Sequence, residues 1–141
     1  MIVLDTNVVS ELMRAVSAPQ VLAWLQRNAD QDLVTTAVTA AEIQYGIARL
    51  PSRRRRADLA AAAAEIFAAF PDQVLPFDLA AAHAYADIVA HRDSLGTPIE
   101  GFDAQIAAIC RTRAAILATR NEKDFTDTGI SITNPWQPDP P

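Results

Sequence analysis

The sequence predicts an α/β domain in which a mostly parallel central sheet is covered by helices on both faces. Two observations lead to this prediction. Short β-branched or apolar runs alternate with helical stretches along the chain, and such alternation is typical of parallel sheets with crossover helices. The 141 residues, half of them apolar, suffice for one sizeable core, so we expect a single domain over residues 1–141.

Two expected strands open the chain, and each is followed by helical sequence. Residues 1–5 form an apolar run typical of a buried strand, and residues 8–29 have a helical pattern that breaks near Pro19. Residues 32–38 are β-branched and predict the second strand. The apolar side chains of residues 39–50 share one face of a helix, which the following proline ends.

The middle of the chain combines two long helices with a short strand. Residues 57–70 are rich in alanine, the residue with the highest helix propensity. A short strand is expected within residues 73–78, and Asp78 can cap the helix predicted over residues 79–95, which Gly96 ends. The larger apolar side chains of the alanine-rich helix form a stripe that favours core packing, namely Leu59, Ile66, Phe67 and Phe70.

The C-terminal part supplies one more helix and two strands. Residues 102–113 predict a helix whose apolar face includes Cys110, which we expect to be buried and unpaired because it is the only cysteine. Residues 114–120 are typical of a buried strand, and residues 129–134 of an edge strand ahead of a proline-rich tail.

Composition argues against several classes of function. The formal net charge of −5 disfavours a general nucleic-acid coating protein but permits a nuclease whose acidic site binds metal ions. His83 and His91 lack a ligand-like spacing, so no zinc site is expected. The N-terminus does not resemble a signal peptide, and no apolar run approaches the roughly 20 residues that span a bilayer. We therefore expect a cytoplasmic protein without membrane contact.

Acidic residues follow the expected strands or begin the adjoining helices. Asp5 follows the first strand, Glu42 is expected in the first turn of the next helix, and Asp103 begins the helix before the fourth strand. Asp124 lies a few residues beyond that strand. Ligands of open parallel sheets gather at the carboxyl ends of the strands, so these acids are candidates for one site. Each also has a structural alternative: Asp5 can cap a helix, and Thr39 with Glu42 fits a capping box.

Several carboxylates at one sheet edge repel one another unless a cation offsets their charge. Oxygen ligands without a matching His or Cys cluster favour a hard ion, Mg²⁺ or Mn²⁺. Such an ion can activate water and bind a phosphate oxygen, which predicts phosphodiester hydrolysis.

Five segments resemble, in order and spacing, the PIN-domain ribonucleases, and within them the VapC and FitB group of bacterial toxins. They are LDTNVVSEL, TAAEIQYGIARL, FDAQIAAI, LATRNEKDF and ITNPW, which together span nearly the whole chain. The resemblance implies a three-layer α/β/α PIN-like domain with metal-dependent endoribonuclease activity on RNA. It also implies a cognate antitoxin that blocks the site, and a homodimer within a larger toxin–antitoxin complex.

By position, the resemblance implies catalytic roles for Asp5, Glu42 and Asp103, with Asp5 and Asp103 as metal ligands. The fourth position departs from the family pattern, because many relatives have Asp directly after the Thr-Arg pair, where this chain has Asn121. We expect Asp124 to serve there as catalytic residue and metal ligand, and the number of metal ions stays open.

Polar neighbours of these acids are expected to hold them in place through hydrogen bonds to the carboxylates or to the water around the metal. Ordinary turn and capping chemistry is an equal alternative. The residues concerned are Thr6, Asn7, Thr119 and Asn121.

A basic run precedes the alanine-rich helix. If Ser52 caps that helix, the run places positive charge in its first turn, which the helix macrodipole disfavours. RNA phosphates or an acidic partner would offset this cost, and a solvated charge run in a loop is the alternative. The candidate RNA-binding residues are Arg53, Arg54, Arg55 and Arg56.

Two other functions stay open. A noncatalytic PIN-like domain that binds RNA or a partner as a regulatory module is favoured if the fourth position is defective. A phosphatase of the haloacid-dehalogenase type also begins with an Asp after a first strand. That class usually has a second Asp two residues later, where this chain has Asn7.

Overall fold

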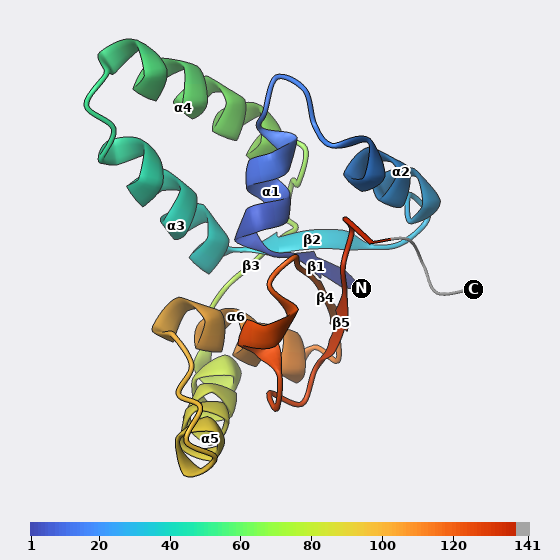
Figure 1. Ribbon diagram of the computed structural model, residues 1–141, viewed down its shortest axis with the longest axis vertical. Coiled ribbons are helices and arrows are strands. Elements are labelled where there is room, and N and C mark those ends of the chain that lie inside the picture. The colour runs from blue at the N-terminus through green and yellow to red at the C-terminus, as the bar shows by residue number, and fades with distance from the viewer. Residues whose placement is uncertain (138–141) are drawn as a thin grey trace.

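The structure is a computed structural model that describes residues 1–137; residues 138–141, with most of the expected proline-rich tail, lie outside the described part. Its centre is a five-stranded sheet in the order β3-β2-β1-β4-β5, in which all neighbouring strands are parallel (Figure 1). The strands are β1 (Ile2–Leu4), β2 (Leu33–Thr36), β3 (Val74–Leu75), β4 (Ile116–Ala118) and β5 (Ser131–Thr133). The predicted strands are thus confirmed, with β5 at an edge.

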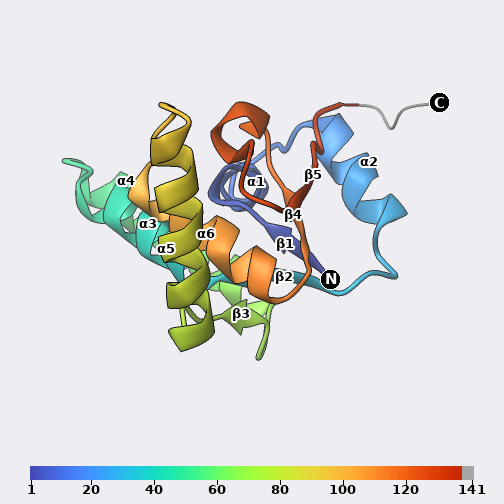
Figure 2. The same ribbon diagram turned by 90° about the horizontal axis from the view of Figure 1, so that it is seen from below.

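Helices cover both faces of the sheet, which confirms the predicted three-layer α/β/α architecture (Figures 1 and 2). One face carries α1 (Thr6–Leu12), α2 (Pro19–Arg27), α3 (Ala37–Ala48) and α4 (Arg53–Ala68). The other face carries α5 (Leu79–Ser94) and α6 (Gly101–Thr112), and a short 3₁₀ turn, η1 (Glu122–Phe125), follows β4. No helix within residues 1–137 is long and apolar enough to cross a membrane.

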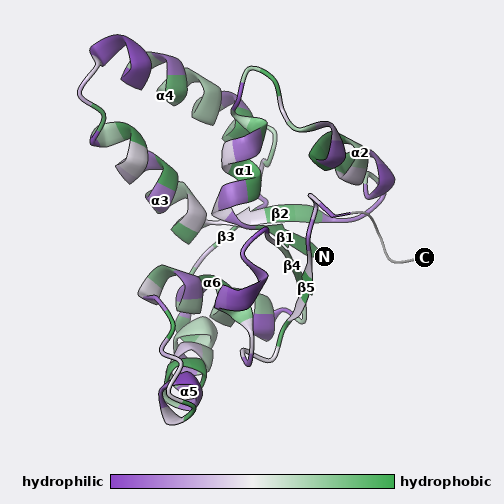
Figure 3. Ribbon diagram, viewed as in Figure 1, coloured by the Kyte–Doolittle hydropathy of each residue, from purple (hydrophilic) through white to green (hydrophobic). Residues whose placement is uncertain are grey.

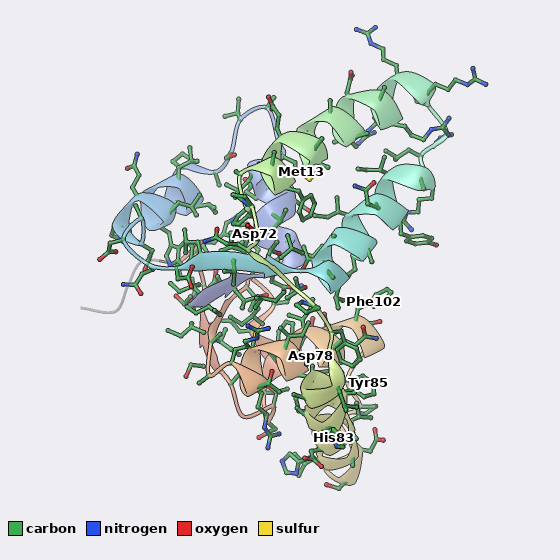
Figure 4. The ribbon with its side chains drawn as sticks, turned by 180° about the vertical axis from the view of Figure 1, so that it is seen from behind. Met13, Asp72, Asp78, His83, Tyr85 and Phe102 are labelled. Carbon is green, nitrogen blue, oxygen red and sulfur yellow. The ribbon has the colours of Figure 1, made fainter. Side chains whose placement is uncertain are left out.

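The sheet has a hydrophobic core on each side because alternate residues of a strand point to opposite faces. In β1, Ile2 and Leu4 pack into the core under α1–α4, whereas Val3 packs into the core under α5 and α6. Cys110 is buried and unpaired, as expected. The predicted stripe packs against the core under α1–α4, although its last member, Phe70, lies just beyond the end of α4. Met13 lies between α1 and α4 (Figure 4).

Local capping fixes where α3 begins. The hydroxyl of Thr36 accepts a hydrogen bond from the Thr39 amide at 3.0 Å, so Thr36 is the N-cap and the helix begins two residues earlier than predicted. Glu42 therefore lies in the second turn, not the first, and the predicted capping box of Thr39 and Glu42 is wrong.

The basic run is helical. Ser52 caps α4 by accepting a hydrogen bond from the Arg55 amide at 3.3 Å, and α4 begins at Arg53. The loop alternative for this run is therefore wrong, and the start of α4 is a hydrophilic tip far from the sheet (Figure 3). At the next helix the sequence prediction is confirmed: Asp78 caps α5, and Gly96 follows its end with a φ of +71°.

Candidate active site

Asp5 lies at the centre of the sheet edge where the strands end. It follows β1, the middle strand, and its backbone amide donates to the carbonyl of Ala118 at the end of β4 over 3.0 Å. Its side chain is only 3% exposed. The parallel topology thus places a carboxylate at the point where the segments after β1, β2 and β4 come together.

Three donors hold the Asp5 carboxylate. Oδ1 accepts from the Thr6 amide at 2.8 Å, and Oδ2 accepts from the Thr119 hydroxyl at 2.7 Å and from the Asn7 side chain at 3.2 Å. Asp5 therefore also caps α1, as the structural alternative states. Burial raises the pKa of Asp5 above its ordinary value, these hydrogen bonds oppose that rise, and the charge of Asp124 adds to it.

Thr119 and Asn7 tie the segments after β1 and β4 together. The buried Thr119 hydroxyl donates to Asp5 and accepts from the Asn7 side chain at 3.2 Å and from the Asn121 amide at 3.0 Å. The Asn7 carbonyl oxygen accepts from the Arg120 amide at 3.2 Å. Since a hydroxyl offers one donor and two acceptor lone pairs, the hydrogen-bonding capacity of Thr119 is used completely.

Glu42 reaches the same region from α3. Its Oε1 accepts from the Thr6 hydroxyl at 2.9 Å, and that hydroxyl also lies 3.1 Å from the hydroxyl of Thr39. Burial raises the pKa of Glu42, the hydrogen bond from Thr6 opposes the rise, and the charges of Asp5 and Glu100 add to it. Thr6 thus contacts two acids, Asp5 through its amide and Glu42 through its hydroxyl.

Asp103 is the third residue of α6, but it does not cap the helix. Glu100 does so, because its Oε2 accepts from the amides of Phe102 at 3.0 Å and Asp103 at 3.1 Å. Among the residues described, none donates a hydrogen bond to the Asp103 carboxylate. Burial, followed by the negative charges of neighbouring acids, raises the pKa of Asp103 to about 7.

Asp5, Glu42 and Asp103 line one cleft of about 550 Å³. Of the predicted supporting residues, Thr6, Asn7 and Asn121 also line it, and Thr119 lies buried behind Asp5. The sequence analysis missed the rest of the wall, which consists of Ser10, Glu11, Arg14, Arg120 and Trp136. The only sequence signal for these residues is that each lies in or beside one of the five motifs. Ser10 and Glu11 belong to LDTNVVSEL and Arg14 follows it, whereas Arg120 belongs to LATRNEKDF and Trp136 ends ITNPW.

Asp124 does not line this cleft. It is exposed and borders an adjoining hollow, which shares Arg120 and Asn121 with the cleft. Its carbonyl is fixed by the buried Arg92, whose guanidinium donates to the backbone of Asp124 at 3.0 Å and of Thr126 at 2.9 Å. The Asp124 carboxylate is still near enough to raise the pKa of Asp5, and its role in the site stays a prediction.

The basic run is remote from the acids. Arg53, Arg54 and Arg55 are exposed at the start of α4, and none of them lines the cleft. Arg56 is half-buried, and its Nη1 donates to the Leu50 carbonyl at 2.7 Å. RNA binding by this run stays a prediction.

The acids of the cleft have the right ligand atoms for a hard metal ion, but their side chains are not grouped around one point. Within residues 1–137, no three Asp, Glu, His or Cys side chains are grouped closely enough to hold a metal ion as they stand. Asp5, Glu42 and Asp103 nevertheless share a cleft and offer only oxygen ligands, which Mg²⁺ and Mn²⁺ prefer. Binding would require these side chains to turn toward a common point.

An apolar groove adjoins the cleft. This hollow of about 300 Å³ lies between α1, α3 and the start of the stripe on α4, and it shares Thr6, Ser10, Arg14 and Glu42 with the cleft. Its apolar lining consists of Met13, Ile43, Gly46, Ile47, Leu50 and Leu59. An extended ligand could therefore contact the groove and the acids at once.

Comparison with known proteins agrees with this geometry. A family model described as PIN domain matches residues 2–130. VapC ribonuclease Y4jK from Sinorhizobium fredii is 40% identical over 98% of this chain and 99% of its own length. Toxin FitB from Neisseria gonorrhoeae is 34% identical over 96% of this chain and 99% of its own length. The crystal structure of FitAcB from that organism matches with a TM-score of 0.87 at 34% identity, over 96% of this chain and 99% of that one.

Proposed function

Because this chain belongs to the PIN-domain family, we propose that it is a metal-dependent endoribonuclease and the toxin of a toxin–antitoxin pair. The relatives support a toxin ribonuclease as the broad class. One observation supports the finer assignment: Asp5, Glu42 and Asp103 arrive from three separate segments and line one cleft. The substrate in this proposal is an RNA phosphodiester bond.

The proposal gives each acid a role. Asp5 and Asp103 would hold Mg²⁺ or Mn²⁺, with Asp124 contributing from the adjoining hollow. A bound ion supplies an activated water and positive charge for the phosphate oxygens. Glu42 is suited to accept a proton at Oε2, because its pKa is raised and that oxygen receives no hydrogen bond from the described residues. Thr6, Asn7 and Thr119 orient the carboxylates.

A comparison of two substrates tests this function. With Mn²⁺ present, the purified protein should cleave single-stranded RNA internally and leave a simple phosphomonoester such as p-nitrophenyl phosphate intact. Hydrolysis of the monoester alone would favour the phosphatase. RNA binding without cleavage would favour the regulatory module, a catalytically weak PIN-like domain.

The apolar groove supports an antitoxin partner. We expect a short antitoxin to place an apolar segment in the groove and an Arg or Lys among Asp5, Glu42 and Asp103, where its charge competes with the metal. The groove is open at Gly46, since no atom beyond the adjoining residues and backbone of its own helix lies within 4 Å of where its Cβ would be. A homodimer within a larger toxin–antitoxin complex is part of the same proposal.

Filling the groove should therefore separate antitoxin binding from RNA cleavage. The product of the adjacent reading frame should copurify with the wild-type protein and with Gly46→Ala, which adds only one methyl group. Gly46→Leu should lose copurification while it keeps most RNA cleavage, because the leucine fills the groove, whereas Asp5 and Asp103 lie outside it. Copurification that is equally strong with Gly46→Leu would exclude the groove as the binding site.

The fourth position can be tested by exchanging its charges. Asp124→Asn should weaken Mn²⁺ binding and cleavage by less than about tenfold, because Asp124 borders the cleft only through the adjoining hollow. Asn121→Asp should tighten Mn²⁺ binding, since Asn121 lines both hollows. Titration of cleavage against Mn²⁺ measures both effects. Unchanged metal dependence in Asp124→Asn would assign that residue to structure and leave a site of three carboxylates.

A further inference from the structure

Arg120 and Trp136 form a stacked pair in one wall of the cleft, and the roles proposed for the acids do not involve this pair. The guanidinium carbon of Arg120 lies 5.0 Å from the ring centroid of Trp136, and both residues line the cleft together with Asp5 and Asp103. Arg120 itself is exposed, whereas Trp136 is half-buried and packs against the core under α1–α4. The indole thus connects the guanidinium to the rigid part of the molecule.

Hydrogen bonds fix both members of this pair. The Arg120 amide donates to Asn7, which also contacts Asp5. The Trp136 amide donates to the Asn134 side chain at 3.0 Å, and the Asn134 side chain donates to Glu122 at 3.2 Å. The segments after β4 and β5 are therefore folded together, so that the indole supports the guanidinium beside the acids.

The positive charge of Arg120 is available to a ligand. Arg14, the other cation in the cleft wall, forms an ion pair with Glu11 at 3.2 Å. Glu11 is in turn held by the Ala18 amide at 2.7 Å. No carboxylate of residues 1–137 forms an ion pair with Arg120, whose guanidinium lies over the indole ring of Trp136. The charge of Arg120 reaches Glu11 only as a minor contribution, after the Ala18 hydrogen bond and Arg14, to the lowered pKa of that acid. Arg120 is thus the cation of this wall that is not already paired with an acid.

We propose that Arg120, held by Trp136, binds a backbone phosphate of the RNA strand next to the bond that is cleaved. This inference rests on the proposed endoribonuclease function. A protein with a net charge of −5 and acids in its cleft needs a local cation to accept a polyanion. A guanidinium offers parallel N–H groups that match phosphate oxygens, and its contact with the indole restricts its orientation before RNA arrives.

The chemistry of the contact sets its role. Phosphate contacts fix the register of a strand but carry no direct sequence information. Arg120 therefore places the scissile bond over the acids and does not select a base. Trp136 is a positioning residue, because it acts on the RNA through Arg120.

RNA binding by an inactive parent protein tests this assignment. A fluorescent RNA oligonucleotide is titrated with Asp5→Asn protein in Mg²⁺ at several salt concentrations. Adding Arg120→Gln should weaken binding about fivefold and reduce the slope of log affinity against log salt by about 0.7, the value for one phosphate contact on a single strand. Trp136→Leu should weaken binding about threefold without changing this slope, because the charge stays. Trp136→Phe should restore most of the loss.

Arg113→Gln is the matched control. It removes the same charge from the exposed end of α6, at the opposite edge of the sheet, and should change neither affinity nor slope. Equal affinity and equal slope for the parent and Arg120→Gln would overturn the phosphate site while leaving the endoribonuclease proposal intact. Absence of RNA binding by the parent would overturn both. If Trp136→Leu fails to fold, Arg120→Gln still decides, since Arg120 is exposed.

Discussion

Asp5→Asn should lower RNA cleavage by more than about 100-fold, because the partners of metal ligands alone are worth about 10- to 100-fold. Asp5 is the acid at the centre of the sheet edge, and three hydrogen bonds hold its carboxylate in one orientation. The substitution removes a buried charge but keeps the size and shape of the side chain.

The fold should survive this substitution. The carbonyl oxygen of the introduced amide can still accept from the Thr6 amide. The new NH₂ group replaces an oxygen that accepts from Thr119 and Asn7, so these two hydrogen bonds are lost and the melting temperature should fall while the protein stays folded. Thermal unfolding and a cleavage assay on the same sample measure the two effects. Asp30→Asn, which changes an exposed acid ahead of β2 at the opposite sheet edge, should cleave at the wild-type rate. Cleavage by Asp5→Asn within a few-fold of wild type would exclude Asp5 from the reaction.

Asp103→Asn should also abolish cleavage, yet it should raise the melting temperature of the metal-free protein at pH 8. The pKa of Asp103 is raised from 3.8 to about 7 by burial and by neighbouring acids, so its ionised form is unfavourable in the folded state. The stability that belongs to the protonated form is fully present below pH 3.8 and is lost as the pH rises toward 7. The gain from this substitution should therefore be largest above pH 7 and should shrink between pH 7 and pH 4.

Adding Mn²⁺ should reverse the order of the melting temperatures of wild type and Asp103→Asn. Because Mn²⁺ binds the folded wild-type protein and needs the ionised carboxylate, it should raise the melting temperature of wild type more than that of Asp103→Asn. Below pH 7 the affinity of the wild type for Mn²⁺ should fall by up to about tenfold per pH unit, as protons compete for Asp103. Melting curves across pH 5–8, with and without Mn²⁺, measure both effects. A variant that is less stable than wild type at pH 8 without metal would contradict the repulsion among the acids.

The fold and the acids of the cleft could be predicted because both follow from local patterns. Strand-like runs, helix stops such as Gly96, and the placement of acids after strands are properties of short segments. The same local reasoning failed at Thr39 and Glu42, because three nearby threonines compete to cap α3 and only the end of β2 decides in favour of Thr36.

The remaining wall of the cleft depends on contacts between distant segments. Arg120 and Trp136 are separated by a strand and a turn, and only their stacking across the loops makes them a pair. Glu100 has a capping pattern that sequence could have revealed, but its charge beside Asp103 depends on how α6 meets the sheet edge. Asp124 shows the limit of reasoning from sequence distance. It is only three residues from Asn121, yet it borders the adjoining hollow and does not line the cleft.

Return of metal to chelated protein is the most direct test of a carboxylate-bound cation in RNA cleavage. Wild-type protein, freed of its antitoxin and treated with excess chelator, is incubated with RNA before and after an excess of Mn²⁺ is added. We predict no cleavage in chelator, full recovery with Mn²⁺ or Mg²⁺, and no recovery for Asp5→Asn under the same conditions. Undiminished cleavage in excess chelator would contradict the proposed mechanism.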